Sequence, residues 1–281
     1  MFRLAAQRSR APRRQGSNYE VGSVRKAMEI LCAFTVDSPL WTLTEISLKL
    51  KIPKSTALNL LRTLESFELV KKDPRDKRYQ LGPRIFQLSP MPSQNVQLGA
   101  KAAPHLHSLA EQTGETVKLG VLFNGKGLIL AAIESKFMLH TRGDEGRLAP
   151  LHCTGIGKAL LASQRDSDLH ESEGRQSLRR FTDRTITRWK RLEEEIAKIR
   201  EAGYSVDREE HEAGVCCIGA MIHTPEGWPP AAISISGPSS RITPHRITKF
   251  APLAMAACRA ISDSLVESMG ERRTAWPKRQ K

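Results

Sequence analysis

Residues 42–67 read TLTEISLKLKIPKSTALNLLRTLESF, and this stretch decides the fold of the first part of the chain. Thr42 and Glu45 have the three-residue spacing of a capping box, which begins a short helix. Only the tripeptide KIP at 51–53 separates that helix from a second segment, 54 to about 67, whose apolar residues recur every three or four positions. A three-residue connection forces a sharp turn, so the stretch predicts a helix-turn-helix.

The solvent side of the second helix carries hydrogen-bond donors and cations, and its first two turns contain no acidic residue. Such a face suits the major groove of DNA, and Asn59 is of the type that makes a bidentate contact to adenine. The alternative is a solvated surface helix, which would normally mix Glu with Lys. The residues expected to contact DNA from this helix are Lys54, Ser55, Thr56, Asn59 and Arg62.

Two short alternating segments, 69–72 and 78–81, follow directly and flank a turn-rich loop. They predict a hairpin, and its position after the helix-turn-helix indicates the wing of a winged helix; an exposed hairpin without a DNA role is the alternative. A helix capped by Ser23 is predicted upstream. The wing cations expected to contact phosphates are Lys71, Arg75, Lys77 and Arg78.

The positive charge of the 281-residue chain, +14 in total, is local. Residues 1–95 contain 17 Lys and Arg against 8 Asp and Glu, residues 271–281 add a net +4, and the remaining 175 residues sum to +1. The charge distribution predicts that one module binds a polyanion while the near-neutral remainder has another role. This argues against a nonspecific architectural DNA binder. Residues 1–20 are expected to be a disordered basic arm, with a DNA-contacting arm as the alternative.

The rest of the chain predicts an α+β organisation with antiparallel strands. Helices are expected to about residue 113, from 155, over 187–202 and after Thr243 as N-cap; strands are expected at 117–123, 128–133, 204–206, 216–223 and 231–236. The domain boundaries that follow are 21–82 for the winged helix-turn-helix, 83–99 for a linker, 100–267 for an effector-binding domain and 268–281 for a basic tail. No apolar stretch is long enough for a membrane span, so we expect a cytoplasmic protein without a membrane partner.

Enzymatic chemistry is not indicated. His152 stands beside Cys153, but the chain has no nucleophile elbow, P-loop or paired metal-ligand motif, so no catalytic residue, cofactor or metal is expected and His152 is interpreted as structural. The five cysteines lack zinc-finger spacing, and the adjacent Cys216 and Cys217 point to opposite faces of a strand. The alternative function is a DNA-binding metal or thiol-redox sensor that uses Cys153, Cys216 and Cys217 with His211 or His223.

These motifs together resemble the IclR family of bacterial regulators, named for the isocitrate lyase regulator. The segments that carry the resemblance are LTEI at 43–46, PKSTA at 53–57, LLRTL at 60–64, RYQLG at 78–82, TGETV at 113–117, LHCTGIGKA at 151–159, IREAGY at 199–204, DREE at 207–210, residues 214–220 and AAISISGP at 231–238. The resemblance implies a GAF-like effector domain, a homodimer or dimer of dimers and a palindromic double-stranded operator. Leu58 and Asn59 depart from the family's usual His and Arg, so the recognition face has lost a cation.

The segment CTGIGK at 153–158 is a loop-to-helix junction, where free amides and the helix dipole favour an anion such as a carboxylate. Many helices begin this way without a ligand. The resemblance implies effector contacts from Gly155, Ile156, Asp207, Cys217, Ser234 and Ser236. Amide and hydroxyl donors fit a small hydroxy or keto acid as effector, and an aromatic acid stays an open alternative. Asp207 equally fits a local pairing role, and Ser234 and Ser236 equally fit one face of any strand.

Overall fold

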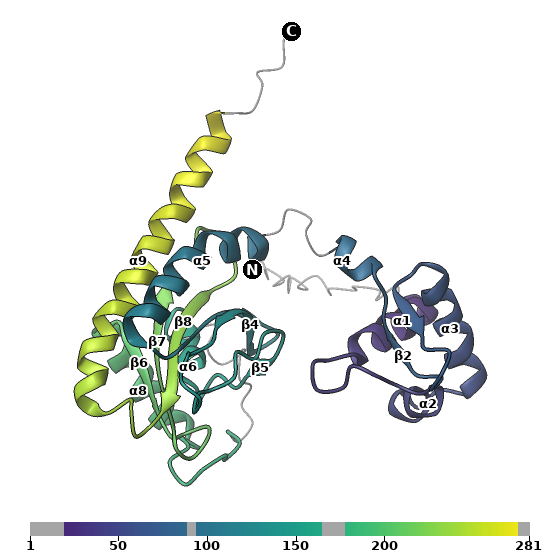
Figure 1. Ribbon diagram of the computed structural model, residues 1–281, viewed down its shortest axis with the longest axis horizontal. Helices are drawn as coiled ribbons and strands as arrows, with labels where there is room; N and C mark the ends of the chain where they lie inside the picture. Colours follow the sequence, from purple (N-terminus) through teal and green to yellow (C-terminus); the bar gives the residue numbers. More distant parts are fainter. Residues whose placement is uncertain (1–19, 89–93, 165–177, 275–281) are drawn as a thin grey trace, which may run out of the picture. The chain divides into compact units, whose positions relative to one another are not determined.

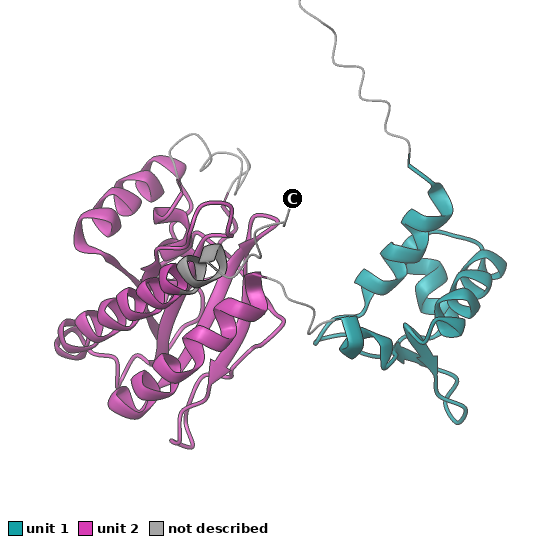
Figure 2. Cartoon of the chain, turned by 90° about the horizontal axis from the view of Figure 1, so that it is seen from above, with its two compact units in different colours: residues 1–88 teal, residues 89–281 magenta. Residues whose placement is uncertain are grey.

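The structure is a computed structural model that describes residues 20–88, 94–164 and 178–274, the last without side chains beyond residue 267. The chain divides into two compact units, 1–88 and 89–281 (Figure 2). The expected N-terminal arm, except Glu20, lies outside the described residues. Within the described ranges, no helix is long and apolar enough to cross a membrane.

The first unit is a winged helix-turn-helix (Figure 1). Its elements are α1 Gly22–Ala33, α2 Leu43–Leu50, α3 Lys54–Ser66, β1 Val70–Lys72, β2 Tyr79–Leu81 and α4 Arg84–Leu88. The strands β1 and β2 pair in antiparallel register. The predicted helices, tight turn and hairpin are confirmed.

Local chemistry explains why these residues fold this way. Thr42 Oγ1 accepts a hydrogen bond from the Glu45 amide, and the Glu45 carboxylate accepts one from the Thr42 amide at 2.7 Å, so the predicted capping box is present. Lys51 adopts a left-handed conformation, with φ 52°, which ends α2 and turns the chain. The apolar core consists of Ile30, Phe34, Ile46, Ile52, Ala57, Leu61, Leu64, Val70 and Tyr79.

The structure differs from the sequence expectations at three element boundaries. Ser23 is not a cap, because α1 begins at Gly22 after Val21 without a side-chain cap; its exposed first amides are open to water. Residues 94–99 of the expected linker are helical, and the effector unit begins before residue 100, because the fully buried Leu98 anchors this turn in that unit's core. The expected tail begins as helix, since α9 continues to Thr274.

The second unit is a six-stranded antiparallel sheet with helices on both faces, and its strand order is β5-β4-β3-β8-β7-β6. The helices α5 and α9 cover one face, and α6 and α8 lie on the other (Figure 1). The elements are α5 Gln94–Thr113, β3 Thr116–Phe123, β4 Lys126–Ile133, β5 Leu148–Ala149, α6 Gly155–Ala162, α8 Trp189–Ala202, β6 Tyr204–Arg208, β7 Val215–Ile222, β8 Ala231–Pro238 and α9 Pro244–Thr274.

The two faces of the sheet differ in chemistry. Alternate residues of β3, including Val117 and Leu119, belong to the apolar core under α5 and α9. On the other face, α6 and α8 form a second apolar core that includes Ile156, Leu160 and Leu192. Polar residues of β3, β6, β7 and β8 share this α6 face, and they form the candidate effector site.

Candidate DNA-binding surface and effector site

The helix α3 presents its predicted polar face to solvent. Its opposite face is buried in the core through Ala57, Leu61 and Leu64. The N-cap position, Pro53, makes no side-chain hydrogen bond, so the first amides of α3 point outward uncapped. Of the predicted residues on this helix, Thr56 is half-buried, and the exposed ones are Lys54, Ser55, Asn59 and Arg62.

The wing turns its carboxylates toward its own backbone. Asp73 accepts a hydrogen bond from the Arg75 amide at 2.7 Å, and Asp76 accepts one from the Arg78 amide at 2.9 Å. The side chains of the four predicted wing residues are exposed, whereas the neighbouring Lys72 lies over the Tyr79 ring and is half-buried. The hairpin therefore presents a cationic edge: Lys71, Arg75, Lys77 and Arg78.

Strand pairing brings four of the predicted effector residues together in the second unit. Asp207 on β6 lies opposite Cys217 on β7, and Cys217 lies opposite Ser236 on β8. Ser234 is two residues away on the same face, and its Oγ is 3.5 Å from that of Ser236. We call these four residues with Lys118 and Thr116 of β3 the polar row, because directly opposed residues of antiparallel strands share a face.

The first turn of α6 lies directly on β7. Thr154 caps the helix by accepting a hydrogen bond from the Gly157 amide at 3.0 Å. The Gly155 carbonyl accepts a hydrogen bond from Ser205 Oγ, and a Cβ at Gly155 would lie 2.9 Å from that of Cys217. A side chain at Gly155 would therefore push α6 off the sheet. Ile156 is an apolar core residue at this junction, and its side chain packs against Gly120 of β3.

Two parts of this site were missed from the sequence. Lys118 lies opposite Ser234, and its Nζ is 2.7 Å from Asp144 Oδ2. The sequence signal that could have identified Lys118 is a cation inside an apolar strand, between Val117 and Leu119, which are both buried. The second part is an aromatic wall in which the Phe181 ring centroid lies 4.9 Å from that of His211 and 6.0 Å from that of His152.

Burial shifts the proton equilibria of this site. Burial raises the pKa of Asp207 to about 7, although the hydrogen bond from the Glu210 amide opposes the rise. Burial also raises the pKa of the Cys217 thiol, with a further contribution from Asp207, and it lowers the pKa of His211. At neutral pH the site therefore holds a protonated thiol, a neutral imidazole and a carboxyl that readily gains or loses a proton.

A fully buried ammonium connects α6 to the end of β6. Lys158 Nζ donates hydrogen bonds to Glu210 Oε1 at 2.6 Å and to the Val206 carbonyl at 2.7 Å, and it lies 3.4 Å from Glu195 Oε1. Glu210 lies three residues after Asp207, and its amide donates to Asp207 Oδ1 at 2.7 Å. This ion pair therefore fixes the end of β6, which carries Asp207, against the helix that carries Gly155.

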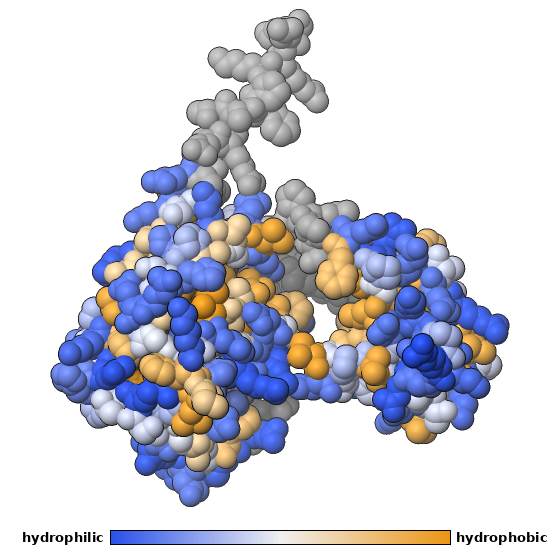
Figure 3. Space-filling view, viewed as in Figure 1, coloured by the Kyte–Doolittle hydropathy of each residue, from blue (hydrophilic) through white to orange (hydrophobic). Residues whose placement is uncertain are grey.

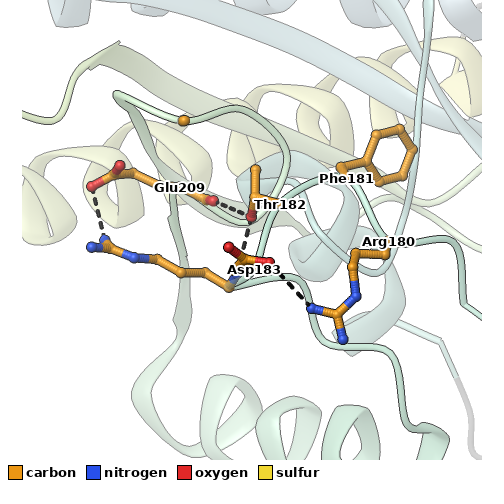
Figure 4. Close-up of a pocket in the computed structure, with 7 residues that line it drawn as sticks. Arg180, Phe181, Thr182, Asp183 and Glu209 are labelled. Atoms are coloured by element: carbon orange, nitrogen blue, oxygen red, sulfur yellow. Dashed lines mark hydrogen bonds and ion pairs between the residues drawn. The ribbon is translucent and has the colours of Figure 1, made fainter.

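A separate open pocket of about 570 Å³ lies beside this loop (Figure 4). Its cations are already paired: Arg184 contacts Glu209 at 2.8 Å, and Arg180 lies 3.8 Å from Asp183. Phe181 lines this pocket and also forms part of the aromatic wall with His211 and His152. None of the six predicted effector residues lines it.

The described residues do not favour a metal or thiol sensor. No group of three His, Cys, Asp or Glu within them is arranged to hold a metal ion. Cys216 and Cys217 lie on opposite faces of β7, as predicted, and burial raises the pKa of both thiols and of Cys258. Sensor cysteines require an accessible thiolate, which these environments oppose.

A winged helix-turn-helix followed by a second domain is an organisation typical of DNA-binding regulators. Two family models match the chain: the IclR helix-turn-helix domain over residues 23–74, and the bacterial transcriptional regulator IclR C-terminal domain over residues 93–263. The chain belongs to the IclR family of transcriptional regulators.

Curated relatives agree over most of the chain. The transcriptional regulator BhcR of Paracoccus denitrificans is 34% identical over 254 residues, which cover 90% of this chain and 91% of the relative. The transcriptional repressor AllR of Escherichia coli is 33% identical and covers 80% of this chain and 83% of its own length. The repressor IclR of Escherichia coli is 30% identical, with 86% and 89% covered. These relatives are transcriptional regulators and repressors, not enzymes.

Solved structures share the fold. The IclR of Thermotoga maritima superposes with a TM-score of 0.67 at 29% identity, over 87% of this chain and 98% of that one. An IclR homologue of Microbacterium hydrocarbonoxydans, solved in complex with 4-hydroxybenzoate, superposes with a TM-score of 0.78 at 22% identity, over 87% and 99%.

The raised pKa of Asp207 predicts a specific pH dependence of stability. Between its ordinary value of 3.8 and about 7, the folded protein retains a proton that the unfolded chain has lost, so this group's contribution to stability falls as pH rises through that window and is constant above it. Asp207→Asn does not titrate. Urea unfolding should show the variant gaining on the wild type by up to about 1.4 kcal/mol per pH unit from pH 4 to 7.

Asp263→Asn, which removes an exposed carboxyl on α9, is the matched control. A pH-independent difference between Asp207→Asn and the wild type would contradict the assignment.

Proposed function

We propose that the protein binds a palindromic DNA operator through α3 and the wing, as a homodimer or dimer of dimers, and that a small organic acid bound at the polar row changes its affinity for that operator. The observation that carries the proposal is the polar row itself, next to the first amides of α6. A regulator that acts on an operator works at the nucleoid, in the cytoplasm.

The exposed face of α3 supports operator recognition. Its side chains combine amide, hydroxyl and guanidinium donors, which match the acceptor-rich edges of bases in the major groove. Lys54 in the first turn opposes the helix dipole, so it does not serve the stability of α3. Beside DNA the same cation, with the open amides of that turn, meets a phosphate.

The chemistry of the polar row supports an organic acid as effector. The hydroxyls of Ser234 and Ser236 and the first amides of α6 are donors for a carboxylate, and Asp207 accepts from, or when protonated donates to, a neighbouring hydroxyl or keto oxygen. The Microbacterium homologue in complex with 4-hydroxybenzoate supports the same class of ligand, here a hydroxy acid with an aromatic ring.

An apolar stripe on α1 supports self-association. Val21, Val24 and Met28 are each more than half exposed, and their spacing places them on one side of the helix. Hydrophilic side chains cover much of the surface in Figure 3, with apolar patches among them. A second copy that covers this stripe would supply the second α3 that a palindromic operator requires.

Base and phosphate contacts give different signatures on substitution. Asn59→Ala should weaken binding to the operator roughly tenfold or more and leave scrambled DNA unaffected, because it removes a base contact. Lys71→Ala should weaken binding to both DNAs and lower the salt dependence by about one counterion. Fluorescence anisotropy with DNA from upstream of the protein's own gene measures both. Lys126→Ala, which removes an exposed cation on β4, is the control. Wild-type behaviour of both Asn59→Ala and Lys71→Ala would refute this surface.

The double variant Ser234→Ala/Ser236→Ala should weaken acid binding about tenfold or more, because it removes donors to a charged group. Calorimetry with pyruvate, lactate and 4-hydroxybenzoate, followed by operator titration at saturating acid, tests this. Ser163→Ala is the matched control. The effector role fails if no acid of the panel alters operator affinity.

Val24→Glu/Met28→Glu should weaken self-association about a hundredfold, because two apolar side chains lose burial and gain charge. Sedimentation velocity against Leu48→Glu, an exposed apolar position on α2, measures this effect. An unchanged oligomer would exclude α1 as the interface.

A further inference from the structure

The loop that joins β4 to β5 reaches back to the polar row through one carboxylate. Asp144 Oδ2 lies 2.7 Å from Lys118 Nζ, and the Lys118 side chain is only 13% exposed. An ammonium so far from water requires an anionic partner. Among the described residues, this anionic partner is Asp144 of the same chain.

Lys118 occupies a central place in the polar row. It lies opposite Ser234 on β8, and Thr116, two residues before it, lies opposite Ser236. Its charge also acts on Cys217 of β7 and on His211. The ammonium therefore faces the same space as the hydroxyls that the proposed function assigns to the effector.

We propose that Lys118 binds the carboxylate of the effector and that Asp144 is an internal counter-ion, which the effector's carboxylate displaces. This inference rests on the proposed function of the polar row. The exchange is purely ionic. One carboxylate replaces another beside the ammonium, no covalent bond is formed or broken, and no proton is transferred.

Asp144 already has a second partner for the displaced state. Arg147 Nε lies 3.3 Å from Asp144 Oδ1, so the carboxylate has a cation available after it leaves Lys118. The loop also has anchors that do not involve this side chain. The Gly143 amide donates to Glu134 at 2.8 Å, and Thr116 Oγ1 donates to the Thr141 carbonyl at 2.8 Å.

The backbone conformation at Asp144 makes asparagine a suitable replacement. Its φ is 62°, a left-handed conformation that glycine adopts without cost and that Asp and Asn tolerate better than other residues. An asparagine side chain at this position would therefore keep the backbone and the volume while removing the charge, which makes Asp144→Asn a clean test.

The two halves of the ion pair should respond in opposite directions. Lys118→Met should weaken binding of 4-hydroxybenzoate, pyruvate or lactate at least tenfold, whereas Asp144→Asn should tighten it about tenfold, because the internal competitor is gone. Lys118→Arg should bind within a few-fold of the wild type. The neutral analogues 4-hydroxybenzamide and lactamide should not gain from Asp144→Asn.

Calorimetry on the full chain measures these affinities, with Lys126→Met as a cation-removal control and with circular dichroism and operator binding as checks of folding. If the ion pair only stabilises the loop, Lys118→Met and Asp144→Asn should change the affinity for the acid in the same direction or not at all. Either result overturns the counter-ion role. If the wild type binds none of the acids, the effector role itself is overturned. If the wild type binds an acid and both variants change its affinity in the same direction, only the role of Lys118 and Asp144 is overturned.

Discussion

The buried ammonium of Lys158 constrains the rest of the effector unit. A charge removed from water is tolerated only beside its partners, so α6 can pack only where Glu210 and the Val206 carbonyl meet it. The same packing presses Gly155 against β7, where the carbonyl of Gly155 occupies the space that a side chain at Gly219 would need. Helix, strand end and the loop after Asp207 thus share one fixed junction at the edge of the polar row.

The polar row stabilises the fold less than apolar side chains at the same positions would. The α5/α9 face shows that this sheet is readily covered by apolar side chains, and the α6 face is apolar too around Ile156 and Leu160. Hydroxyls, a carboxyl and an ammonium nevertheless occupy one end of that face. Because buried polar groups cost free energy unless they are paired, a position where sequence rules for packing fail in this way is typical of a binding site.

Local signals made most of the fold predictable, because a capping box or a left-handed stop such as Gly203 involves residues within one turn. The start of α1 was misplaced because Ser23 has cap chemistry but lies inside the helix. Contacts between distant residues were not predictable: Lys118 and Asp144 are 26 positions apart, and Lys158 and Glu210 are 52 apart. The effector residues came from family resemblance, whereas the exposed α3 face followed from helical periodicity alone.

The two units hold their cations in different physical environments. In the first unit the cations are exposed and lie in excess over acids, so their field reaches beyond the surface and attracts a polyanion in a salt-dependent manner. In the second unit Lys118 and Lys158 are shielded and paired with carboxylates, so they add little field outside. A neutralised ammonium does not compete for DNA, and in the proposed function Lys118 exchanges its internal partner for an entering carboxylate. Under that proposal, the separation of exposed from paired cations lets one basic chain distinguish an operator from a small acid.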